Sequence, residues 1–265
     1  NSINVDSTSL ISGRGGGVLA TISNLTFFFC NIENNYMHSN VNDEVVDGSG
    51  FRFSESYTII EGCKFKGNVI DSVGFTYGGA IKFQLSELEL VNSSFDDNIL
   101  NNGNGLIQNY GGAVFIILST YIIQSCNFSN NKLFSSSSTT SNCRSYGAAS
   151  YIQNSRGSIN NCLFMNNYAS SDCTSSVLSV SYGGAVHPND SNTNFNECTF
   201  INNSCYANGK KAESDGGGIF NMNNISIIIK CTFNKNSVYS YGGETNAMGG
   251  GAFMQSCSVT LDDSF

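Results

Sequence analysis

The chain has 265 residues, of which only 12 % are charged, and it contains 28 glycines, one proline and no tryptophan. Its net charge of −8, with no basic cluster, argues against nucleic acid or an anionic membrane surface as a partner. No apolar run approaches the roughly 20 residues of a membrane-spanning helix, so we expect no membrane insertion.

One repeat organises the whole sequence. Each copy opens with a triplet of small residues, reaches a cysteine or serine thirteen residues after the triplet, then a phenylalanine or isoleucine two residues later and an asparagine three residues after that. The triplets end at Gly17, Gly50, Ala80, Ala113, Ala149, Ala185 and Gly218. A fixed period of 30–36 residues predicts a single elongated array over residues 1–265 rather than separate globular domains.

The first expected element of each copy is a strand directly after the triplet, as in AVFIIL at 113–118. A second apolar position follows three residues before the cysteine position. Alternation along a straight strand would not place that position and the cysteine on one face, so we expect the chain to turn a corner between them.

The cysteine position holds serine in the third copy, at Ser93, and cysteine in the others: Cys30, Cys63, Cys126, Cys162, Cys198 and Cys231. Neighbouring copies could form disulfides in the pairs 30–63, 126–162 and 198–231, or the column could consist of buried thiols, and both alternatives stay open. Cys143, Cys173 and Cys205 lie in successive variable segments, where a bridge between two of them is the favoured disulfide. Without a C-x-x-C spacing, zinc is not expected.

A short C-x-F strand comes next and ends at the asparagine. We expect the phenylalanines to stack in the interior, at Phe65, Phe95, Phe128, Phe164, Phe200 and Phe233. We expect the asparagines to form tight turns with left-handed backbone and to hydrogen-bond from copy to copy, at Asn35, Asn68, Asn98, Asn131, Asn167, Asn203 and Asn236.

Between the phenylalanine and the next triplet, 15 to 21 residues intervene, and all the length variation of the repeat lies here. We expect these segments, including the serine-rich run 135–141, to be loops. A tyrosine column precedes four successive triplets, at Tyr77, Tyr110, Tyr146 and Tyr182. Its rings could grip sugars or a neighbouring molecule, or they could cover the glycine corner, which is the interpretation that we favour.

These elements predict an all-β fold, a parallel β-helix solenoid of about eight coils with almost no helix. The GGA[I/V] motifs at 78–81, 111–114 and 183–186, together with F-x-x-N at 65–68, 95–98, 128–131, 164–167, 200–203 and 233–236, resemble the repeats of chlamydial polymorphic outer-membrane proteins and of some protist surface proteins. The resemblance covers nearly the whole chain. It implies a right-handed β-helix exposed at a cell surface, often in adhesion.

Ten cysteines and six N-x-S/T sequences predict an extracellular or cell-surface protein. The N-x-S/T sequences also make the protein a candidate for N-glycosylation. The candidate acceptors are Asn24, Asn92, Asn127, Asn189, Asn202 and Asn224.

We predict no catalytic residue and no cofactor. Carboxylate pairs occur at Asp96–Asp97 and Asp262–Asp263, but no carboxylate column builds up across copies, and His38 and His187 are isolated. Asp43, Glu44 and Asp47 could hold calcium, although a solvated loop is the preferred interpretation.

The two ends of the sequence supply complementary parts of a coil, because a copy starting at Asn1 after Phe265 would keep the frame. We therefore expect a non-catalytic extracellular structural protein that extends a fibre, either by joining copies of itself head to tail or because these residues are a window of a longer β-helix. The alternatives are an adhesin that binds through variable segments and the tyrosine column, and a carbohydrate-active enzyme similar to pectate lyases.

Overall fold

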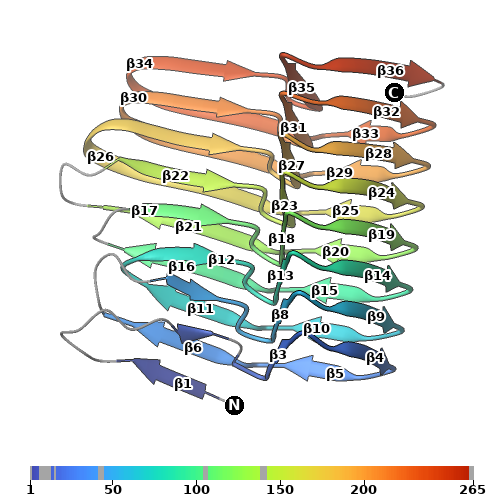
Figure 1. Cartoon of the computed structure of the whole chain (residues 1–265). Helices are drawn as coiled ribbons and strands as arrows, with labels where there is room; N and C mark the ends of the chain where they lie inside the picture. The colour runs from blue at the N-terminus through green and yellow to red at the C-terminus, as the bar shows by residue number, and fades with distance from the viewer. Residues whose placement is uncertain are drawn as a thin grey trace.

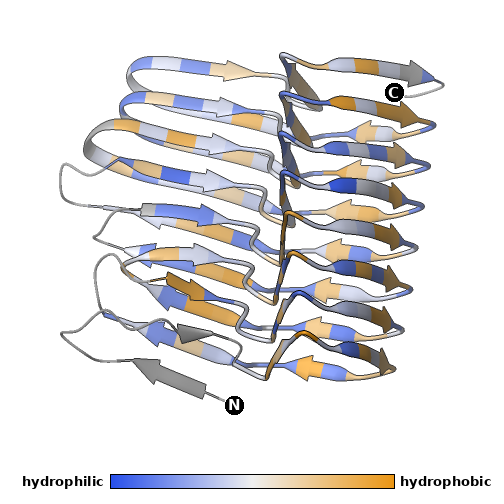
Figure 2. Cartoon of the chain, viewed as in Figure 1, coloured by the Kyte–Doolittle hydropathy of each residue, from blue (hydrophilic) through white to orange (hydrophobic). Residues whose placement is uncertain are grey.

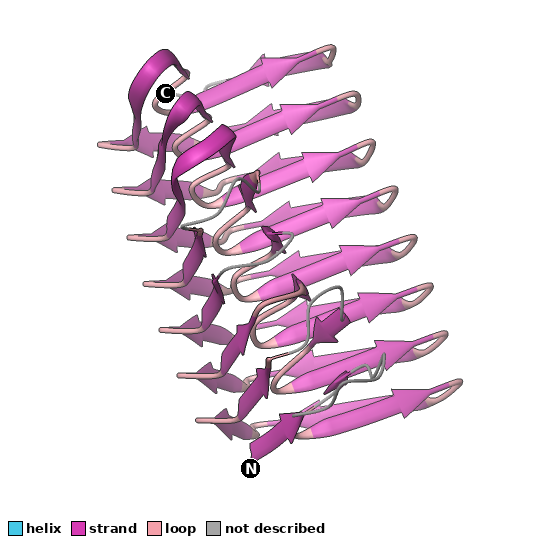
Figure 3. Ribbon diagram, turned by 90° about the vertical axis from the view of Figure 1, so that its left-hand side faces the viewer, coloured by secondary structure: helices cyan, strands magenta, loops and turns pink. Residues whose placement is uncertain are grey.

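The computed structural model describes residues 2–5, 13–14, 16–40, 45–103, 107–137 and 142–262, and these residues form no helix. Every strand pairs in parallel with the equivalent strand of the next coil, so the chain winds as a β-solenoid (Figure 1 and Figure 3). This confirms the predicted parallel β-helix. Two of its sheets have eight strands and a third has seven, so the described residues make about seven full turns, close to the predicted eight coils. The right-handed sense stays a prediction from the resemblance.

Each coil passes through four sheets in turn. Sheet 1 follows the small triplet and contains β3 (Val18–Thr21), β8 (Phe51–Ser54), β13 (Ile81–Gln84), β18 (Val114–Ile117), β23 (Ser150–Gln153), β27 (Val186–Asn189), β31 (Ile219–Met222) and β35 (Ala252–Gln255). Sheet 2 contains β4 (Asn24–Phe28), β9 (Tyr57–Glu61), β14 (Glu87–Val91), β19 (Thr120–Gln124), β24 (Arg156–Asn160), β28 (Asn192–Asn196), β32 (Ile225–Ile229) and β36 (Ser258–Asp262).

Sheet 3 contains β5 (Asn31–Glu33), β10 (Lys64–Lys66), β15 (Ser94–Asp96), β20 (Asn127–Ser129), β25 (Leu163–Met165), β29 (Thr199–Ile201) and β33 (Thr232–Asn234). Sheet 4 has thirteen strands: β1 (Ser2–Val5), β2 (Gly13–Arg14), β6 (Tyr36–Ser39), β7 (Val45–Asp47), β11 (Val69–Ser72), β12 (Phe75–Tyr77), β16 (Ile99–Gly103), β17 (Ile107–Tyr110), β21 (Lys132–Ser136), β22 (Cys143–Tyr146), β26 (Tyr168–Tyr182), β30 (Ser204–Asp215) and β34 (Ser237–Met248).

Sheets 1, 2 and 3 enclose the main apolar core. The predicted phenylalanine column lies at its centre, and consecutive rings from Phe65 to Phe233 stack with centroid distances of 4.7 to 4.9 Å. Because each coil has an open apolar face, only the stacking of coils removes these rings from water. The colouring in Figure 2 shows the apolar residues repeating at the same places from coil to coil.

Sheet 4 forms an arm that projects from this body (Figure 1). The prediction of loops between the phenylalanine and the triplet is wrong for most of this segment, because strands run out along the arm and back. In the last three coils the strands β26, β30 and β34 continue around the tip without interruption. Serine, threonine and asparagine side chains between the two layers are buried and hydrogen-bonded to one another or to the backbone, as at Ser135, Ser145 and Ser171.

All four corners of a coil use a residue with left-handed backbone. In the coil around Ala80 these residues are Gly78 (φ 63°), Leu85 (φ 52°), Asn92 (φ 48°) and Asp97 (φ 52°). The left-handed residue at the last corner precedes the asparagine column, so the predicted left-handed geometry of the column itself is wrong by one residue. The column asparagine instead points inward, where its side chain can reach the neighbouring coils.

The asparagine column is a continuous hydrogen-bond ladder from Asn35 to Asn236, as predicted. Asn98 Oδ1 accepts bonds from the backbone N–H and the Nδ2 of Asn68 at 3.1 and 2.9 Å. Asn98 Nδ2 in turn donates to the Phe65 carbonyl and to Asn131 Oδ1. Each amide between the two ends of the ladder therefore joins its own coil to both neighbouring coils.

Candidate functional site

The tyrosine column lies where the arm meets sheet 1, and with the facing residues of sheet 1 it forms what we call the aromatic corner. The rings of Tyr77, Tyr110, Tyr146 and Tyr182 stack along the axis with centroid distances of 5.2, 5.2 and 5.6 Å. The second side of the corner is a column of buried rings at Phe115, Tyr151, His187 and Phe220.

Ring faces in the aromatic corner are covered by other rings. Tyr182 packs on Phe220 at 4.2 Å and Tyr110 on Tyr151 at 4.9 Å, in addition to the stacking within each column. The hydroxyl groups also have protein partners, since Tyr182 donates to Glu213 Oε1 and Asn189 donates to the Tyr151 hydroxyl. A cavity of about 200 Å³ remains at its edge. This arrangement favours the structural interpretation of the tyrosine column, because few ring faces are left for a sugar.

His187 is fully enclosed in this corner. Burial lowers the pKa of His187 to about 3, and its Nδ1 lies 2.9 Å from the Phe220 carbonyl oxygen. The imidazole is therefore neutral at physiological pH and holds two coils together. His38 lies elsewhere, on β6, with Nδ1 3.4 Å from Asp71 Oδ2, so the two histidines are not brought together.

A buried ion cluster closes one end of the tyrosine column. Asp47 is fully buried, and its carboxylate contacts Arg52 Nε at 2.7 Å and Lys82 Nζ at 2.6 Å. The Lys82 ammonium also lies 4.5 Å from the centre of the Tyr77 ring. Asp47 is therefore neither part of a solvated loop, which was the preferred interpretation, nor free to hold calcium, which was the alternative, because it is buried between two cations. The other two acidic residues, Asp43 and Glu44, lie outside the described residues.

At the opposite end of the column lies a buried carboxyl group, Asp215, which forms no ion pair with any described residue. Asp215 occupies the same register as Tyr182, and its Oδ1 accepts the Met248 backbone N–H at 3.0 Å. Burial, together with the charge of Glu213, raises the pKa of Asp215 to about 7. This carboxyl group changes its protonation state near neutral pH.

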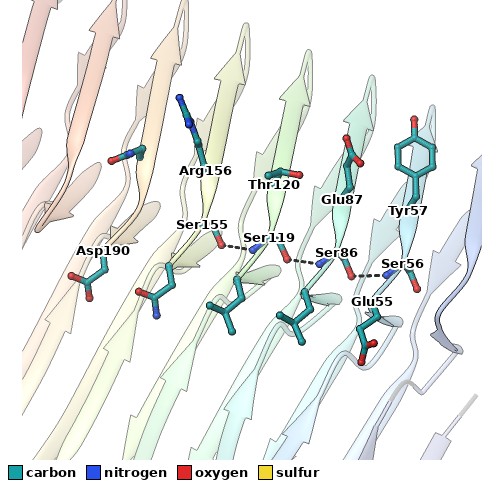
Figure 4. A pocket seen from close by; sticks show the side chains of 14 residues that line it. Glu55, Ser56, Tyr57, Ser86, Glu87, Ser119, Thr120, Ser155, Arg156 and Asp190 are labelled. Atoms are coloured by element: carbon teal, nitrogen blue, oxygen red, sulfur yellow. Dashed lines mark hydrogen bonds between the residues drawn. The ribbon is translucent and has the colours of Figure 1, made fainter.

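A second surface, which we call the serine groove, runs along the corner between sheets 1 and 2. Its floor is a serine column at Ser56, Ser86, Ser119, Ser155 and Ser191, six residues after the triplets. The backbone N–H of each serine donates to the Oγ of the next, at 3.0 to 3.2 Å from Ser56 to Ser191 (Figure 4). Each Oγ donates to a carbonyl two residues earlier, as from Ser86 to Gln84 at 2.7 Å. The polar groups of the floor are thus used within the fold.

Two rows of side chains, all exposed except the partly buried Tyr57, form the walls of the serine groove. One row comes from the left-handed corner position and the other from the start of each sheet 2 strand. Figure 4 shows the two rows pointing to opposite sides of the serines. The first row is Glu55, Leu85, Leu118, Asn154 and Asp190, and the second is Tyr57, Glu87, Thr120, Arg156 and Asn192. The groove is open, has a volume of about 890 Å³ and crosses five coils. Sequence reasoning missed it, although the fixed offset of the serines from the triplet marks its floor.

The cysteine column consists of thiols. The N–H of Cys30 donates to Cys63 Sγ at 3.3 Å and that of Cys126 to Cys162 Sγ at 3.4 Å, so sulfur replaces the serine oxygen of Ser93 in the same kind of ladder. The possible disulfides 30–63, 126–162 and 198–231 are not formed, because side chains stacked in parallel point the same way. The favoured prediction, a bridge between two of Cys143, Cys173 and Cys205, is confirmed. Cys143 and Cys173 form a disulfide between two coils of the arm, and Cys205 is a buried thiol.

Of the carboxylate pairs considered for catalysis, Asp96 lies beside a lysine, with its Oδ2 3.4 Å from Lys66 Nζ. Asp96 accepts bonds from Ser129 and Asn130, and although burial raises its pKa, these bonds and Lys66 outweigh that effect and lower it. Asp97 makes the left-handed turn after it. Asp262 ends β36, and Asp263 lies outside the described residues. In the described part of the chain, no three metal-binding side chains cluster.

The glycosylation candidates differ in accessibility. Asn24, Asn92 and Asn202 are exposed, and Asn127 and Asn189 are partly buried. Asn224 is buried, and its Nδ2 donates to Asn221 Oδ1. Modification of any of them stays a prediction.

No family model, curated protein or solved structure matches this chain. Among the residues that the structure describes, no helix is long and apolar enough to cross a membrane. The geometry of the repeat is that of a parallel β-solenoid.

Proposed function

We propose that this protein is an extracellular, non-catalytic structural β-solenoid that forms a fibre by head-to-tail association of its copies. The observation that carries the proposal is the asparagine ladder, in which every interior amide bonds to the coil before and the coil after it. Such a ladder, with the stacked phenylalanines beside it, is a motif that gains stability with every added coil. A fold that becomes more stable as coils are added is suited to forming a long rod.

The terminal coils support axial association. Phe200 is fully buried between two coils. By contrast, Phe233 and Val259 near the C-terminal end of the stack, and Leu25 and Phe27 in the first coil, are only partly buried although they pack against the same core. A further coil stacked in register would bury these side chains and pair the strand edges beside them. We propose that this coil is supplied by another copy or by flanking coils of a longer chain.

The resemblance to the repeats of polymorphic outer-membrane proteins belongs to the same proposal. It is supported by the positions of the motifs, since GGA[I/V] makes the corner before sheet 1 and F-x-x-N makes sheet 3 and the corner after it. Ten cysteines and the Cys143–Cys173 disulfide support an oxidising, extracellular location.

Negative-stain electron microscopy of the purified chain tests the fibre. Eight coils at about 4.8 Å per coil predict unbranched fibres with an axial repeat of about 38 Å. The variant Val259→Lys places a charge at the exposed end of the core and is expected to abolish the fibres. Its matched control is Thr260→Lys, which changes an exposed side chain of the same strand and should leave the fibres intact. Discrete short rods from the wild-type chain would contradict the proposal.

A further inference from the structure

We propose that the serine groove is a binding site for an uncharged linear polysaccharide that lies along the solenoid axis. The groove is on the side of the rod and uses no residue of the terminal coils, so this inference goes beyond the fibre and does not depend on it. Five coils at about 4.8 Å per coil give the groove a length of about 19 Å between the first and last wall residues.

Most polar side chains of the walls have no partner among the described residues. The two exceptions are Tyr57, which donates to Glu89 Oε1, and Asn192, whose Oδ1 accepts the Ile225 backbone N–H. Within the described part of the chain, no hydrogen bond or ion pair involves the side chains of Glu55, Glu87, Asn154, Arg156 or Asp190. In the aromatic corner, by contrast, carboxylates and hydroxyls already have protein partners. The groove therefore presents a row of acceptors and donors, one or two per coil, to whatever lies in it.

The apolar part of the walls carries a steric cost. Leu85 and Leu118 are each 49 % exposed, and both have left-handed backbone, which costs about 1–2 kcal/mol for a residue other than glycine. They lie one coil apart in the first row. Glycine, or an asparagine or aspartate such as Asn154 and Asp190 at the equivalent corners, would occupy this position at lower cost. Two adjacent exposed leucines therefore indicate an apolar contact with a ligand.

The direction of the groove disfavours a peptide. A peptide usually binds a β-protein by adding a strand to a sheet edge, where its backbone finds free N–H and carbonyl groups. Here the ligand would cross the strands at right angles, and the serine ladder has already used the N–H groups of the floor. Side-chain acceptors and donors at regular spacing suit hydroxyl groups instead, which both donate and accept.

Charge selects among polysaccharides. The walls carry three carboxylates, at Glu55, Glu87 and Asp190, and one guanidinium, at Arg156. An anionic chain would meet like charges over most of the groove, whereas sugar hydroxyls can donate to the carboxylates. The leucines provide the apolar surface that the C–H face of a sugar ring contacts. Together these features favour a neutral glycan.

The test is an NMR or calorimetric titration of the whole chain with the neutral hexasaccharides cellohexaose, mannohexaose and N-acetylated chitohexaose. Saturable binding is expected for at least one of them, with weaker binding of the corresponding disaccharide because it spans only part of the groove. Polygalacturonate, the anionic control, is expected not to bind. Binding of polygalacturonate alone, or of none of the neutral chains, would overturn the proposal.

Variants locate the site. Thr120→Trp fills the groove from the first position of β19 and is expected to weaken binding roughly tenfold or more, equivalent to about 1.4 kcal/mol. Gln124→Trp adds the same side chain to an exposed position at the other end of that strand and should bind normally. Equal loss in both variants would contradict the assignment. Circular dichroism confirms that each variant folds, and fibre formation by both variants separates this site from the axial association.

Discussion

The Tyr121 hydroxyl lies 2.6 Å from Thr193 Oγ1, although the two residues are two coils apart in the stack. Gly157 occupies the register position between them. A Cβ atom at Gly157 would lie 2.7 Å from ring atoms of Tyr121, so the glycine makes the space through which the ring reaches its partner. Both polar groups are buried in the main core and satisfy each other there.

We expect Tyr121→Phe to lower the free energy of unfolding by about 1–3 kcal/mol, because the Thr193 hydroxyl would be buried without a partner. Urea unfolding followed by circular dichroism measures the change. Adding Thr193→Val should recover much of the loss, since both polar groups are then absent. A Tyr121→Phe variant as stable as the wild type would show that water or another group can serve Thr193.

Asn131→Ala should destabilise the solenoid by about 2 kcal/mol or more, because the N–H and the amide of Asn98 both lose their acceptor inside the core. Asn236→Ala is the matched control. Asn236 accepts the same two bonds from Asn203 but is only partly buried, so water can replace them. Equal losses from the two variants, measured by urea unfolding, would contradict the stabilising role assigned to the interior amides.

The sequence predicted the body of the coil because its packing repeats one residue type at one position. Each member of the phenylalanine, asparagine and tyrosine columns stacks on a residue of the same type in the next coil. This stacking follows directly when equivalent strands pair in parallel and in register. The Cys143–Cys173 disulfide was also favoured on sequence grounds, because the two residues occur in successive variable segments.

The arm and the groove were missed for different reasons. Serine and asparagine in the variable segment indicated loops, but there they bond to one another between two strand layers, as Ser135 and Ser145 do. These hydrogen bonds join polar side chains in a segment that has no periodic apolar residues. The pattern of hydrophobic residues therefore does not reveal the strands of the arm. The groove walls vary in type from coil to coil, from Glu55 to Leu85 to Asn154, and a variable position forms no visible column.

The cysteine thiols should resist labelling in the native state. The hydrogen bond with the Cys126 thiol raises the pKa of Cys162 to about 12. The hydrogen bond with the Cys162 thiol likewise raises the pKa of Cys198 to about 12. We expect iodoacetamide at pH 8 to modify the partly buried Cys30 and Cys257 before any buried column thiol, with full reaction only in denaturant. Peptide mass mapping identifies the sites. Rapid labelling of Cys162 in the folded chain would contradict the ladder.

Asp215 should make stability depend on pH near neutrality. Its pKa of about 7 in the folded chain lies above the ordinary value of 3.8, so the folded state binds a proton more tightly than the unfolded state does. The contribution is therefore complete below about pH 4 and is lost as pH rises through 7. We expect the urea midpoint to fall over this interval on account of Asp215.

Asp215→Asn should remove this fall and make the chain more stable than the wild type at pH 8, because the amide oxygen can still accept the Met248 N–H without a buried charge. Asp190→Asn, which neutralises an exposed carboxylate of the serine groove, should keep the fall. Urea unfolding midpoints of the wild type and both variants at pH 5, 6, 7 and 8 test whether Asp215 causes the fall. If Asp215→Asn keeps the wild-type pH profile, then Asp215 has the same pKa in the folded and the unfolded chain, which would contradict the raised pKa assigned to it.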